Sequence, residues 1–418
     1  MPPLTERDAW VIVASANQVG PATMEKLLRE FGSASGVLDA VTDRTARGRL
    51  APLLGRRGEP AFDGLVEAAC DARGIVSRLA GSRVRVVTLE DDDYPPKLRS
   101  ASLAPPVLFV DGSIEVLSQA PAVAVVGTRK PTEAGRRTAA RIGGALVGAG
   151  SIIVSGLAVG IDGAAHAAAI EAGGQTIAVL GGGIDRLFPQ AHRRLAAEIV
   201  ERGGAVVSEF LPWIDPLPAS FPRRNRIISG LASATVVVEA GRRSGALSTA
   251  KWSLDQGRGC FLVPGSLDAP ASVGCLAFLR EHPDAARIVA GIPELLVDLD
   301  LGAAGETRGA TATGRRIGAA LAEGGPVERE VGRLIAAGVA TVDELVAATE
   351  LPVATVLAAI TLLEGRGLVV DALGRYRPAG SLGTAAPRPV RRRSGGAVAE
   401  MRRASRTKER QILPAGRC

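Results

Sequence analysis

The sequence predicts an α/β protein whose main domain is a doubly wound, mainly parallel sheet, preceded by a helical domain and followed by a winged helix. Between residues 122 and 263, apolar runs rich in small and β-branched residues alternate with helical stretches of about ten residues or more. Before this region the apolar residues follow helical spacing alone, and after it two helical stretches lead into a short β-hairpin pattern. These observations define the expected architecture.

The N-terminal segment, residues 1–80, is expected to form a small helical domain. Asn17 to Pro21 interrupts the helical pattern, which then resumes with Met24, Leu27, Leu28 and Phe31. The pattern is similar to a helix-hairpin-helix, or SAM-like, module, whose hairpin N–H groups can contact a DNA phosphate. Gln18 replaces the first glycine usual in such hairpins, so a hairpin kept only for packing is an equally good interpretation.

Residues 81–300 are expected to form the sheet domain, and the Gly-, Ala- and Thr-rich residues 301–320 a linker. Paired prolines mark an extended lead-in before the first predicted strand. The predicted strands are Ala122–Val126, Ser151–Val154, Thr176–Leu180, Ala205–Ser208, Thr235–Glu239 and Cys260–Val263. Helical connections between consecutive strands are typical of parallel pairing.

Residues 321–378 fit a winged helix. Thr341 and Glu344 form a capping box that opens a short helix. The next helix, residues 352–365, would be the recognition helix, and Arg366 is the single basic residue that it carries at its end. Because a helix that reads the major groove needs several donors, the pattern favours an interaction role over duplex reading.

The net charge of +7 comes from the C-terminal tail. Residues 379–418 contain ten Lys and Arg against two acidic residues, a charge of +8, so the remaining chain carries −1. The tail is basic and of low complexity, which predicts disorder. A binding site for a polyanion on the folded part must therefore be a local cluster.

The four cysteines form no CxxC pair and the chain has three histidines, so we expect no structural zinc site. This cysteine usage is typical of a reducing compartment. The N-terminus has no signal-peptide pattern, and no apolar run is long enough to span a membrane. We therefore expect a cytoplasmic protein without a cofactor.

A candidate phosphate-binding turn follows the strand at residues 122–126. Gly127 allows a sharp turn and a close approach of a ligand. Thr128 and the N–H groups at the start of the next helix can bind an anion. Arg129 and Lys130 add positive charge to the same turn. We expect this turn to lie at the carboxyl end of its strand, where doubly wound sheets bind their ligands.

A second turn begins at Ser155 and Gly156, which we also include in the predicted site. Asp162 is placed to cap the following helix, and His166 lies one turn further on the same face. An acid–base pair is one interpretation of these two residues. Capping and packing is the favoured one.

The segment from Phe221 to Arg226 supplies the largest cluster of cationic side chains. Arg223, Arg224 and Arg226, with the amide of Asn225, precede an apolar helix. Because this run adjoins a buried segment, phosphate binding is favoured over a merely solvated face. Aromatic residues are only 3% of the chain, and Phe221 is the best candidate for stacking on a base.

The sequence argues against a nucleotide-dependent enzyme. Gly181 to Gly183 supplies a GxG, but Arg186 stands where a dinucleotide-binding fingerprint needs a third glycine. The chain also lacks a Walker motif. Glu239 could act as a general base or pair with an arginine and orient it, and the second role is favoured. We therefore expect a binding protein and not an enzyme.

These motifs together resemble the DNA-processing protein A family (DprA/Smf), over about Trp10 to Tyr376. The resemblance is strongest in four segments: Val125–Arg129, Ser155–Asp162 with His166, Phe221–Gly230 and Glu239–Ala250. The family's G-S-R turn corresponds to Gly127-Thr128-Arg129, and its RNR segment to Arg224-Asn225-Arg226. The chain departs from the family pattern at Phe188 to His192, where Tyr-Pro-x-x-Asn is common.

The resemblance implies an extended Rossmann fold that binds single-stranded DNA. It also implies a homodimer that protects incoming DNA and loads RecA recombinase in natural transformation or recombination. The main alternative is a nucleotide phosphoribohydrolase-like enzyme, which has the same sheet type and a PGGxGTxxE motif. The corresponding stretch here, Gly241–Ala250, contains no acidic residue. A structural adaptor acting through the winged helix is a second alternative.

Overall fold

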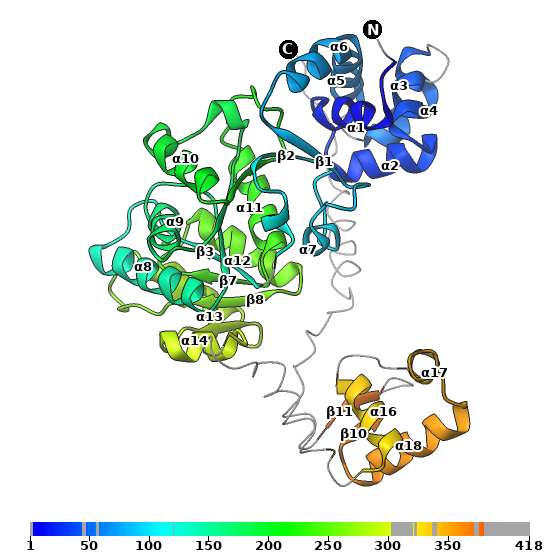
Figure 1. Ribbon diagram of the computed structural model, residues 1–418, viewed down its shortest axis with the longest axis vertical. Helices are drawn as coiled ribbons and strands as arrows, with labels where there is room; N and C mark the ends of the chain where they lie inside the picture. The colour runs from blue at the N-terminus through cyan, green and yellow to red at the C-terminus, as the bar shows by residue number, and fades with distance from the viewer. Residues whose placement is uncertain are drawn as a thin grey trace, which may run out of the picture. The chain divides into compact units, whose positions relative to one another are not determined.

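The computed structural model describes residues 3–43, 47–55, 58–119, 121–301, 321, 324–336, 341–371 and 376–379. The chain divides into two compact units, Met1–Gly309 and Ala310–Cys418. The first contains the N-terminal helices and the large sheet, and the second contains the winged helix (Figure 1). Almost all of the predicted linker, and the basic tail from residue 380 on, lie outside the described residues.

The N-terminal part consists of α1 (Glu6–Ser15), α2 (Pro21–Phe31), α3 (Ala34–Thr42), α4 (Arg47–Leu54), α5 (Gly58–Cys70) and α6 (Ala72–Ala80). Gln18 has a φ of 64°, so the α1–α2 hairpin keeps the left-handed backbone that a glycine would adopt. Gly64 of α5 lies against Asn17, and a Cβ at Gly64 would overlap the Asn17 backbone. The hairpin is thus packed on α5, as the packing interpretation requires.

The sheet of the first unit contains nine strands among the described residues, in the order β1-β2-β6-β5-β4-β3-β7-β8-β9. The strands are β1 (Arg85–Thr88), β2 (Val107–Gly112), β3 (Ala122–Val126), β4 (Ile152–Ser155), β5 (Thr176–Val179), β6 (Ala205–Ser208), β7 (Ala234–Val237), β8 (Gly259–Leu262) and β9 (Ala286–Ile288). In this spatial order, every neighbouring pair from β6 across to β9 is parallel. The pairs β1–β2 and β2–β6 are antiparallel.

The predicted fold class is confirmed, and the predicted strands agree with β3 to β8 to within two residues at each end. The antiparallel β1–β2 pair is the main feature that the sequence missed, since we expected only an extended lead-in there. The chain progresses from β3 outward to β6 and then returns to the other side of β3 with β7. The strand order therefore switches between β3 and β7, where such sheets bind ligands.

Helices cover both faces of the sheet (Figure 1). One face carries α8, α9, α10 and α14, and the other carries α7, α11, α12 and α13. Their bounds are α7 (Pro96–Arg99), α8 (Glu133–Gly148), α9 (Ile161–Glu171), α10 (Arg193–Glu201), α11 (Ser220–Leu231), α12 (Gly245–Asp255), α13 (Val273–Glu281) and α14 (Ile292–Asp298). The described residues also form the short 3₁₀ helices η2 (Glu115–Leu117), η3 (Ile184–Arg186) and η4 (Gln190–His192).

The helical part and the sheet share one hydrophobic core. Trp10 of α1, Phe109 of β2 and Ile199 of α10 belong to the same cluster of buried side chains. Arg78 of α6 adds a cation–π contact, with its guanidinium carbon 3.6 Å from the ring centre of Trp213 in the β6–α11 loop. The N-terminal helices are therefore fixed to the sheet.

The second unit is formed by α16 (Pro326–Ala336), α17 (Val342–Thr349), α18 (Val353–Gly365), β10 (Val369–Asp371) and β11 (Tyr376–Pro378). The predicted capping box is confirmed, because the Thr341 hydroxyl accepts from Glu344 N and the Glu344 carboxylate accepts from Thr341 N. No single described helix is long and apolar enough to cross a membrane; α17 and α18 meet that criterion only together, and they are bent by 115°.

The first turn of α8 is held by the carboxylate of Glu239, which follows the end of β7. Thr132 caps α8 by accepting from Gly135 N, and its own N–H and hydroxyl donate to Glu239 at 2.9 and 2.6 Å. Gly135 lies directly against the Glu239 carboxyl group, so a Cβ at this position would overlap it. This contact joins the first turn of α8 to the strand that neighbours β3.

The variant Gly135→Ala should destabilise the first unit by about 1.5–3 kcal/mol, because Glu239 must release hydrogen bonds that its charge strengthens. Gly144→Ala on the same helix is the matched control. No atom lies within 4 Å of a Cβ built at Gly144, so that variant should gain about 0.4–1 kcal/mol. Differential scanning calorimetry of both variants checks this, and equal shifts in melting temperature would contradict it.

Candidate nucleic-acid interface

The turn after β3 uses most of its own backbone donors internally. Gly127 N lies 3.4 Å from an Asp162 carboxylate oxygen, and Thr128 N donates to the Glu239 carbonyl at 2.7 Å. Gly127 itself packs against Ile161, whose Cγ1 would lie 2.6 Å from an added Cβ. The expected cradle of free N–H groups is therefore wrong at Gly127, Thr128 and Thr132, and the close approach at Gly127 is made by a side chain of the protein.

Asp162 ties this turn to the one after β4. Its carboxylate accepts from Gly127 N at 3.4 Å and from Gly156 N at 3.1 Å, while Gly160 is the residue at the N-cap of α9. The predicted capping role is thus corrected, because Asp162 binds the N–H groups of two other turns. Burial raises the pKa of Asp162, and the nearby Arg224 guanidinium and these N–H groups oppose that shift.

His166 is completely buried behind this pair of turns. Thr176 Oγ1 donates to the Ile153 carbonyl, so it accepts from His166 Nδ1 at 2.7 Å, and Nε2 has no partner among the described residues. Burial, with smaller effects from His192 and Arg224, lowers the pKa of His166 to about 3. The packing interpretation is the one that this geometry supports.

Ser155 and Gly156 do not reach the surface. The Ser155 hydroxyl donates to the Val125 carbonyl at 2.6 Å, and Gly156 is covered by the guanidinium of Arg224. Our expectation that they contact a ligand directly is therefore contradicted by their burial. They join the ends of β3 and β4 beneath the surface.

Arg224 and Asn225 are buried as well, at 4% and 7% exposure. Arg224 Nη1 donates to the carbonyls of Gly156, at 2.8 Å, and Val179, while Asn225 Nδ2 donates to the Gly245 carbonyl. Burial lowers the pKa of Arg224 to about 10, with Asp162 opposing that shift. The two side chains connect α11 to the ends of β4, β5 and α12.

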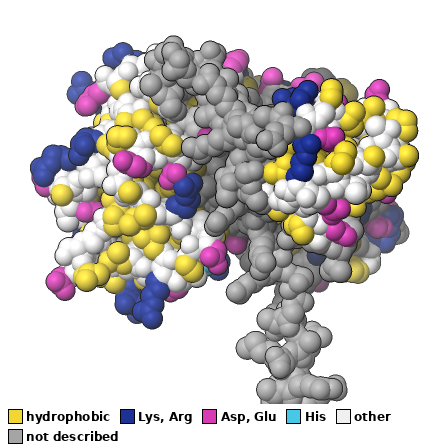
Figure 2. All heavy atoms as spheres, turned by 90° about the horizontal axis from the view of Figure 1, so that it is seen from below, with side chains coloured by type: hydrophobic (Ala, Val, Ile, Leu, Met, Phe, Trp, Pro, Cys, Tyr) yellow, Lys and Arg dark blue, Asp and Glu magenta, His cyan; other side chains and the backbone are white. Residues whose placement is uncertain are grey.

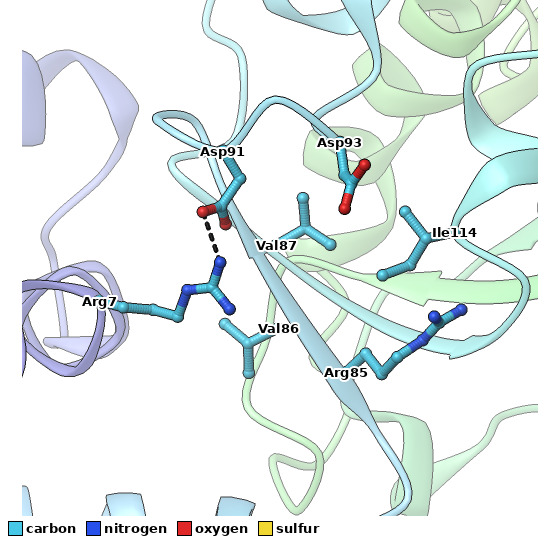
Figure 3. A pocket seen from close by; sticks show the side chains of 7 residues that line it. All are labelled: Arg7, Arg85, Val86, Val87, Asp91, Asp93 and Ile114. Carbon is cyan, nitrogen blue, oxygen red and sulfur yellow. Dashed lines mark hydrogen bonds and ion pairs between the residues drawn. The ribbon is translucent and has the colours of Figure 1, made fainter.

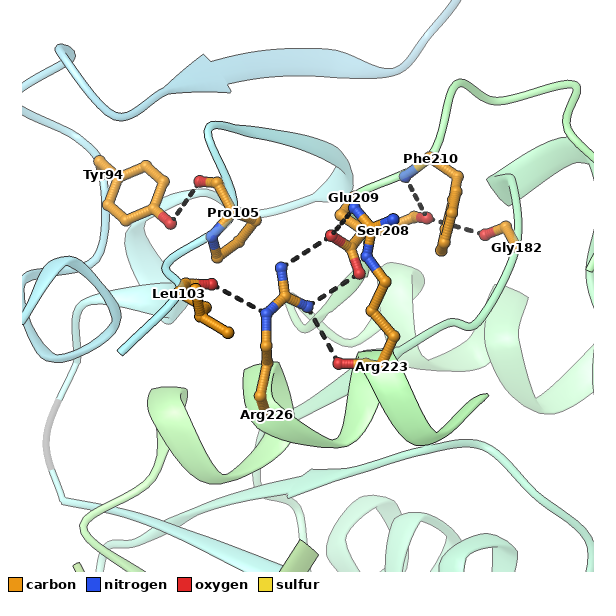
Figure 4. Close-up of polar contacts among 9 residues, drawn as sticks. All are labelled: Tyr94, Leu103, Pro105, Gly182, Ser208, Glu209, Phe210, Arg223 and Arg226. Atoms are coloured by element: carbon orange, nitrogen blue, oxygen red, sulfur yellow. Dashed lines mark hydrogen bonds and ion pairs between the residues drawn. The ribbon is translucent and has the colours of Figure 1, made fainter. Parts of the chain in front are cut away.

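Arg226 forms a buried ion pair with Glu209 (Figure 4). Its Nη1 and Nη2 donate to the two Glu209 oxygens at 2.8 Å each, and its Nε donates to the Leu103 carbonyl. Arg223 shares Glu209, also at 2.8 Å, from a position where its side chain is 40% exposed. Burial opposes the charge of Glu209, but Arg226 and Arg223 hold its pKa below the usual value.

A phosphate cannot reach Arg224, Asn225 or Arg226 without displacing these internal partners. Their placement at a contact surface is therefore corrected, and of the site residues predicted in this segment only Phe221 and Arg223 remain accessible. The sequence pattern could not separate the arginines that face solvent from those that face the core.

The accessible cationic groups of the first turn lie beside Phe221. Arg129 and Lys130 are exposed, and the Arg129 guanidinium carbon is 5.3 Å from the centre of the Phe221 ring. Arg129 makes no ion pair with any residue that the structure describes. Phe221 lies in the space left by Gly181, because a Cβ there would be 2.8 Å from its ring. The turns after β3 and β5 and the first turn of α11 thus meet at one small surface.

Phe188 belongs to this surface, and the sequence analysis did not include it among the site residues. Its ring is 50% exposed, and its centre is 5.9 Å from that of Phe221, at an interplanar angle of 55°. The nearest sequence signal was the departure from the family pattern at residues 188–192. That departure keeps an aromatic residue at the position where Tyr is common.

Other charged groups are scattered over the first unit. Arg242 and Arg243, in the loop after β7, are exposed near the switch point. On the face shown in Figure 2, Lys and Arg side chains form small groups among acidic and apolar ones. No cluster of three or more His, Cys, Asp or Glu among the described residues could hold a metal ion. The surface around Arg129 is therefore distinguished by the contact of an unpaired guanidinium with an aromatic ring, and not by a high density of positive charge.

A cavity of about 320 Å³ lies elsewhere, between α1 and β1 (Figure 3). Arg7 and Asp91 form an ion pair at 2.5 Å on one side of it, and Arg85 and Asp93 also line it. Its lining carries both signs of charge and none of the predicted site residues. It belongs to the junction between the helical part and the sheet.

Comparison with known proteins agrees with this architecture. The family model described as DNA recombination-mediator protein A matches residues 85–300, which span the sheet domain. A second model, the DprA winged helix domain, matches residues 318–374.

The chain belongs to the DprA/Smf family of DNA-processing proteins. It is 34% identical over 386 residues to a putative DNA processing protein DprA of Mycobacterium tuberculosis, covering 88% of this chain and 93% of that protein. It is 42% identical over 217 residues to Protein Smf of Escherichia coli, covering 52% of this chain and 57% of that protein. The X-ray structure of DprA from Streptococcus pneumoniae superposes with a TM-score of 0.58 at 32% identity, covering 71% of this chain and 99% of that one.

Within this family member, the winged-helix unit presents a mainly apolar helix face. Val353, Leu357 and Leu362 of α18 are 50%, 41% and 50% exposed, and apolar side chains are visible on this unit in Figure 2. Arg366, the basic residue at the end of α18, lies 3.5 Å from Glu328. This surface favours the interaction role over duplex reading, which remains a prediction.

The buried His166 predicts a specific dependence of stability on pH. Because its pKa falls from 6.5 to about 3 on folding, the unfolded chain takes up a proton below pH 6.5 that the folded chain does not. As the pH is lowered from 6.5 towards 3, the free energy of unfolding should therefore decrease, by about 1.4 kcal/mol per pH unit well below pH 6.5. His166→Asn keeps a donor towards Thr176 without titrating, so its stability should fall less between pH 7 and 5.

Urea unfolding of the wild-type chain and of His166→Asn at each pH measures this difference. The control is His282→Asn. His282 caps the end of α13 and is only partly buried, so the stability of this variant should change with pH as that of the wild type does. Parallel stability curves for the wild type and His166→Asn would contradict the assignment.

Proposed function

We propose that this chain binds single-stranded DNA at the surface formed by the carboxyl ends of β3 and β5 and the first turn of α11. The observation that carries the proposal is the exposed Arg129 guanidinium, which has no ion-pair partner among the described residues and lies 5.3 Å from the centre of Phe221. Such an arginine can grip a phosphate with two parallel hydrogen bonds. The aromatic cluster beside it, Phe221 with the more exposed Phe188, offers a surface to an unpaired base.

This combination favours a single strand over a duplex. In a duplex the base faces are stacked inside, and only phosphates and groove edges are accessible. Arg129 and Lys130 would bind either form, whereas an aromatic surface gains contact only with an unpaired base. Membership in a family of DNA-processing proteins supports DNA as the ligand.

The buried side chains have positioning roles in this proposal. Arg224 and Arg226 hold the first turns of α11, and therefore Phe221, against the sheet. Asp162 and Glu239 hold the turn that carries Arg129. Direct contacts are assigned to the accessible Thr128, Arg129, Lys130, Phe221 and Arg223.

We propose that the chain is not an enzyme. A phosphoribohydrolase needs a carboxylate that faces the ribose, but Asp162 and Glu239 are only 6% and 9% exposed and accept hydrogen bonds from the backbone. Both are thereby committed to the framework. Release of free base from a nucleoside monophosphate by the purified chain would support the enzyme alternative instead.

Two further proposals rest on the family resemblance. The chain would act in the cytoplasm as a homodimer, and it would protect incoming single strands and load RecA onto them in natural transformation or recombination. Analytical ultracentrifugation tests the dimer. Faster RecA filament formation on DNA coated with a single-strand-binding protein tests the loading activity, and no acceleration would exclude it.

Arg129→Ala should weaken binding to single-stranded DNA by about ten- to a hundredfold, because a charge-assisted contact of this kind contributes roughly 1.5–3 kcal/mol. The slope of log affinity against log salt should fall by about 0.7, the value of one single-strand phosphate contact. Arg129→Lys should recover part of the loss, since lysine supplies charge without the bidentate geometry. Fluorescence anisotropy titrations with an oligo-dT measure all three quantities.

The matched control is Arg137→Ala, which removes an exposed arginine of α8 that lies 3.4 Å from Glu133. It should leave affinity nearly unchanged. If Arg129→Ala instead lowers the melting temperature and the folded protein keeps its affinity, Arg129 is a structural residue and the proposed site is wrong.

A further inference from the structure

We propose that Phe188 provides the open base-stacking face of this site, with Phe221 as its support. This inference rests on the proposed single-strand binding and names a residue that the sequence analysis left out. It predicts that one nucleobase of the bound strand lies on the outer face of the Phe188 ring.

Phe188 is exceptional among the phenylalanines of this chain. All eight phenylalanines lie in the described residues, and Phe188, at 50%, is the one whose side chain is exposed. An aromatic side chain stabilises a folded protein mainly when it is buried. Phe188 and the unpaired Arg129 guanidinium both contact Phe221, at 5.9 and 5.3 Å from its ring centre. An open aromatic face in the same cluster as a free cationic group fits a ligand that is both planar and anionic, as a nucleotide is.

Phe221 has less free surface, although it was the sequence-based candidate. The Arg129 guanidinium lies over its ring, Gly181 lies against its edge, and Phe188 approaches it from a third direction. The two phenylalanine rings are 5.9 Å apart and inclined by 55°. A base cannot fit between them, because stacking on both would require parallel rings about 7 Å apart. The accessible aromatic face of the cluster is therefore that of Phe188.

The loop that carries Phe188 is anchored on both sides. Ile184 and Leu187 before it are 6% and 8% exposed, and after it His192 Nδ1 lies 2.9 Å from the Leu157 carbonyl. The backbone that carries the ring is thus held in place before any ligand arrives, which reduces the entropy lost on binding. Arg186 on the same loop lies 3.6 Å from Asp215, so the loop adds little net positive charge. Its contribution to binding should be mainly apolar.

The test compares affinity for oligo-dT with affinity for an abasic strand of the same length and charge. Phe188→Ala should weaken binding to oligo-dT by about five- to a hundredfold, the usual range for losing one base–aromatic stack. Binding to the abasic strand should stay unchanged, and so should the salt slope with oligo-dT. Phe188→Leu should behave as Phe188→Ala, whereas Phe188→Trp should keep the wild-type affinity.

Leu267→Ala is the control, because it removes an apolar side chain that is 82% exposed in the loop after β8. It should change neither affinity. Equal losses for both strands in Phe188→Ala, or full affinity in Phe188→Leu, would overturn the inference while leaving the proposed function intact. A wild-type chain that fails to bind oligo-dT would instead refute the proposed function, and the inference with it.

Discussion

The burial of two guanidinium groups at the start of α11 is the constraint on which the site depends. A buried charge costs several kcal/mol of desolvation unless it is paired or fully hydrogen-bonded. Arg226 meets this requirement with both oxygens of Glu209. Arg224 meets it only in part, because its Nη1 donates to carbonyls at the ends of β4 and β5 while its buried Nε has no partner among the described residues. These bonds fix the rotation and position of α11 on the sheet. They thereby set where Phe221, one helical turn earlier, meets Arg129 from β3.

Two buried carboxylates complete the framework from the other side. Asp162 and Glu239 accept the N–H groups that a phosphate would otherwise find at the turns after β3 and β4. The turns are therefore rigid, but their backbone attracts anions less than a free helix N-terminus does. Attraction at the surface depends instead on the side chains of Arg129 and Lys130. This arrangement suits a ligand that presents repeated charges and flat apolar groups to a shallow surface.

The sequence was sufficient for the fold class and for the central strands of the sheet. Apolar runs and their helical connections predicted β3 to β8, because a strand buried on both faces must be apolar along its length. The burial of Arg224, Asn225 and Arg226 was not predictable, because their partners lie far away in the sequence and form no motif with them. Arg226 binds Glu209 and Leu103, whereas Arg224 and Asn225 bind backbone carbonyls of other strand and helix ends. Phe188 was missed for the complementary reason: its exposure is a property of packing, and a single phenylalanine carries no sequence signal for it.

The most direct test of this account is the reactivity of individual arginines towards phenylglyoxal, mapped by mass spectrometry with and without oligo-dT. In the free protein Arg129, Arg223 and Arg137 should react, and Arg224 and Arg226, at 4% and 3% exposure, should not. Oligo-dT should protect Arg129 and leave Arg137 reactive. If Arg224 and Arg226 react in the free protein and become protected by DNA, the division into contacting and positioning arginines is wrong.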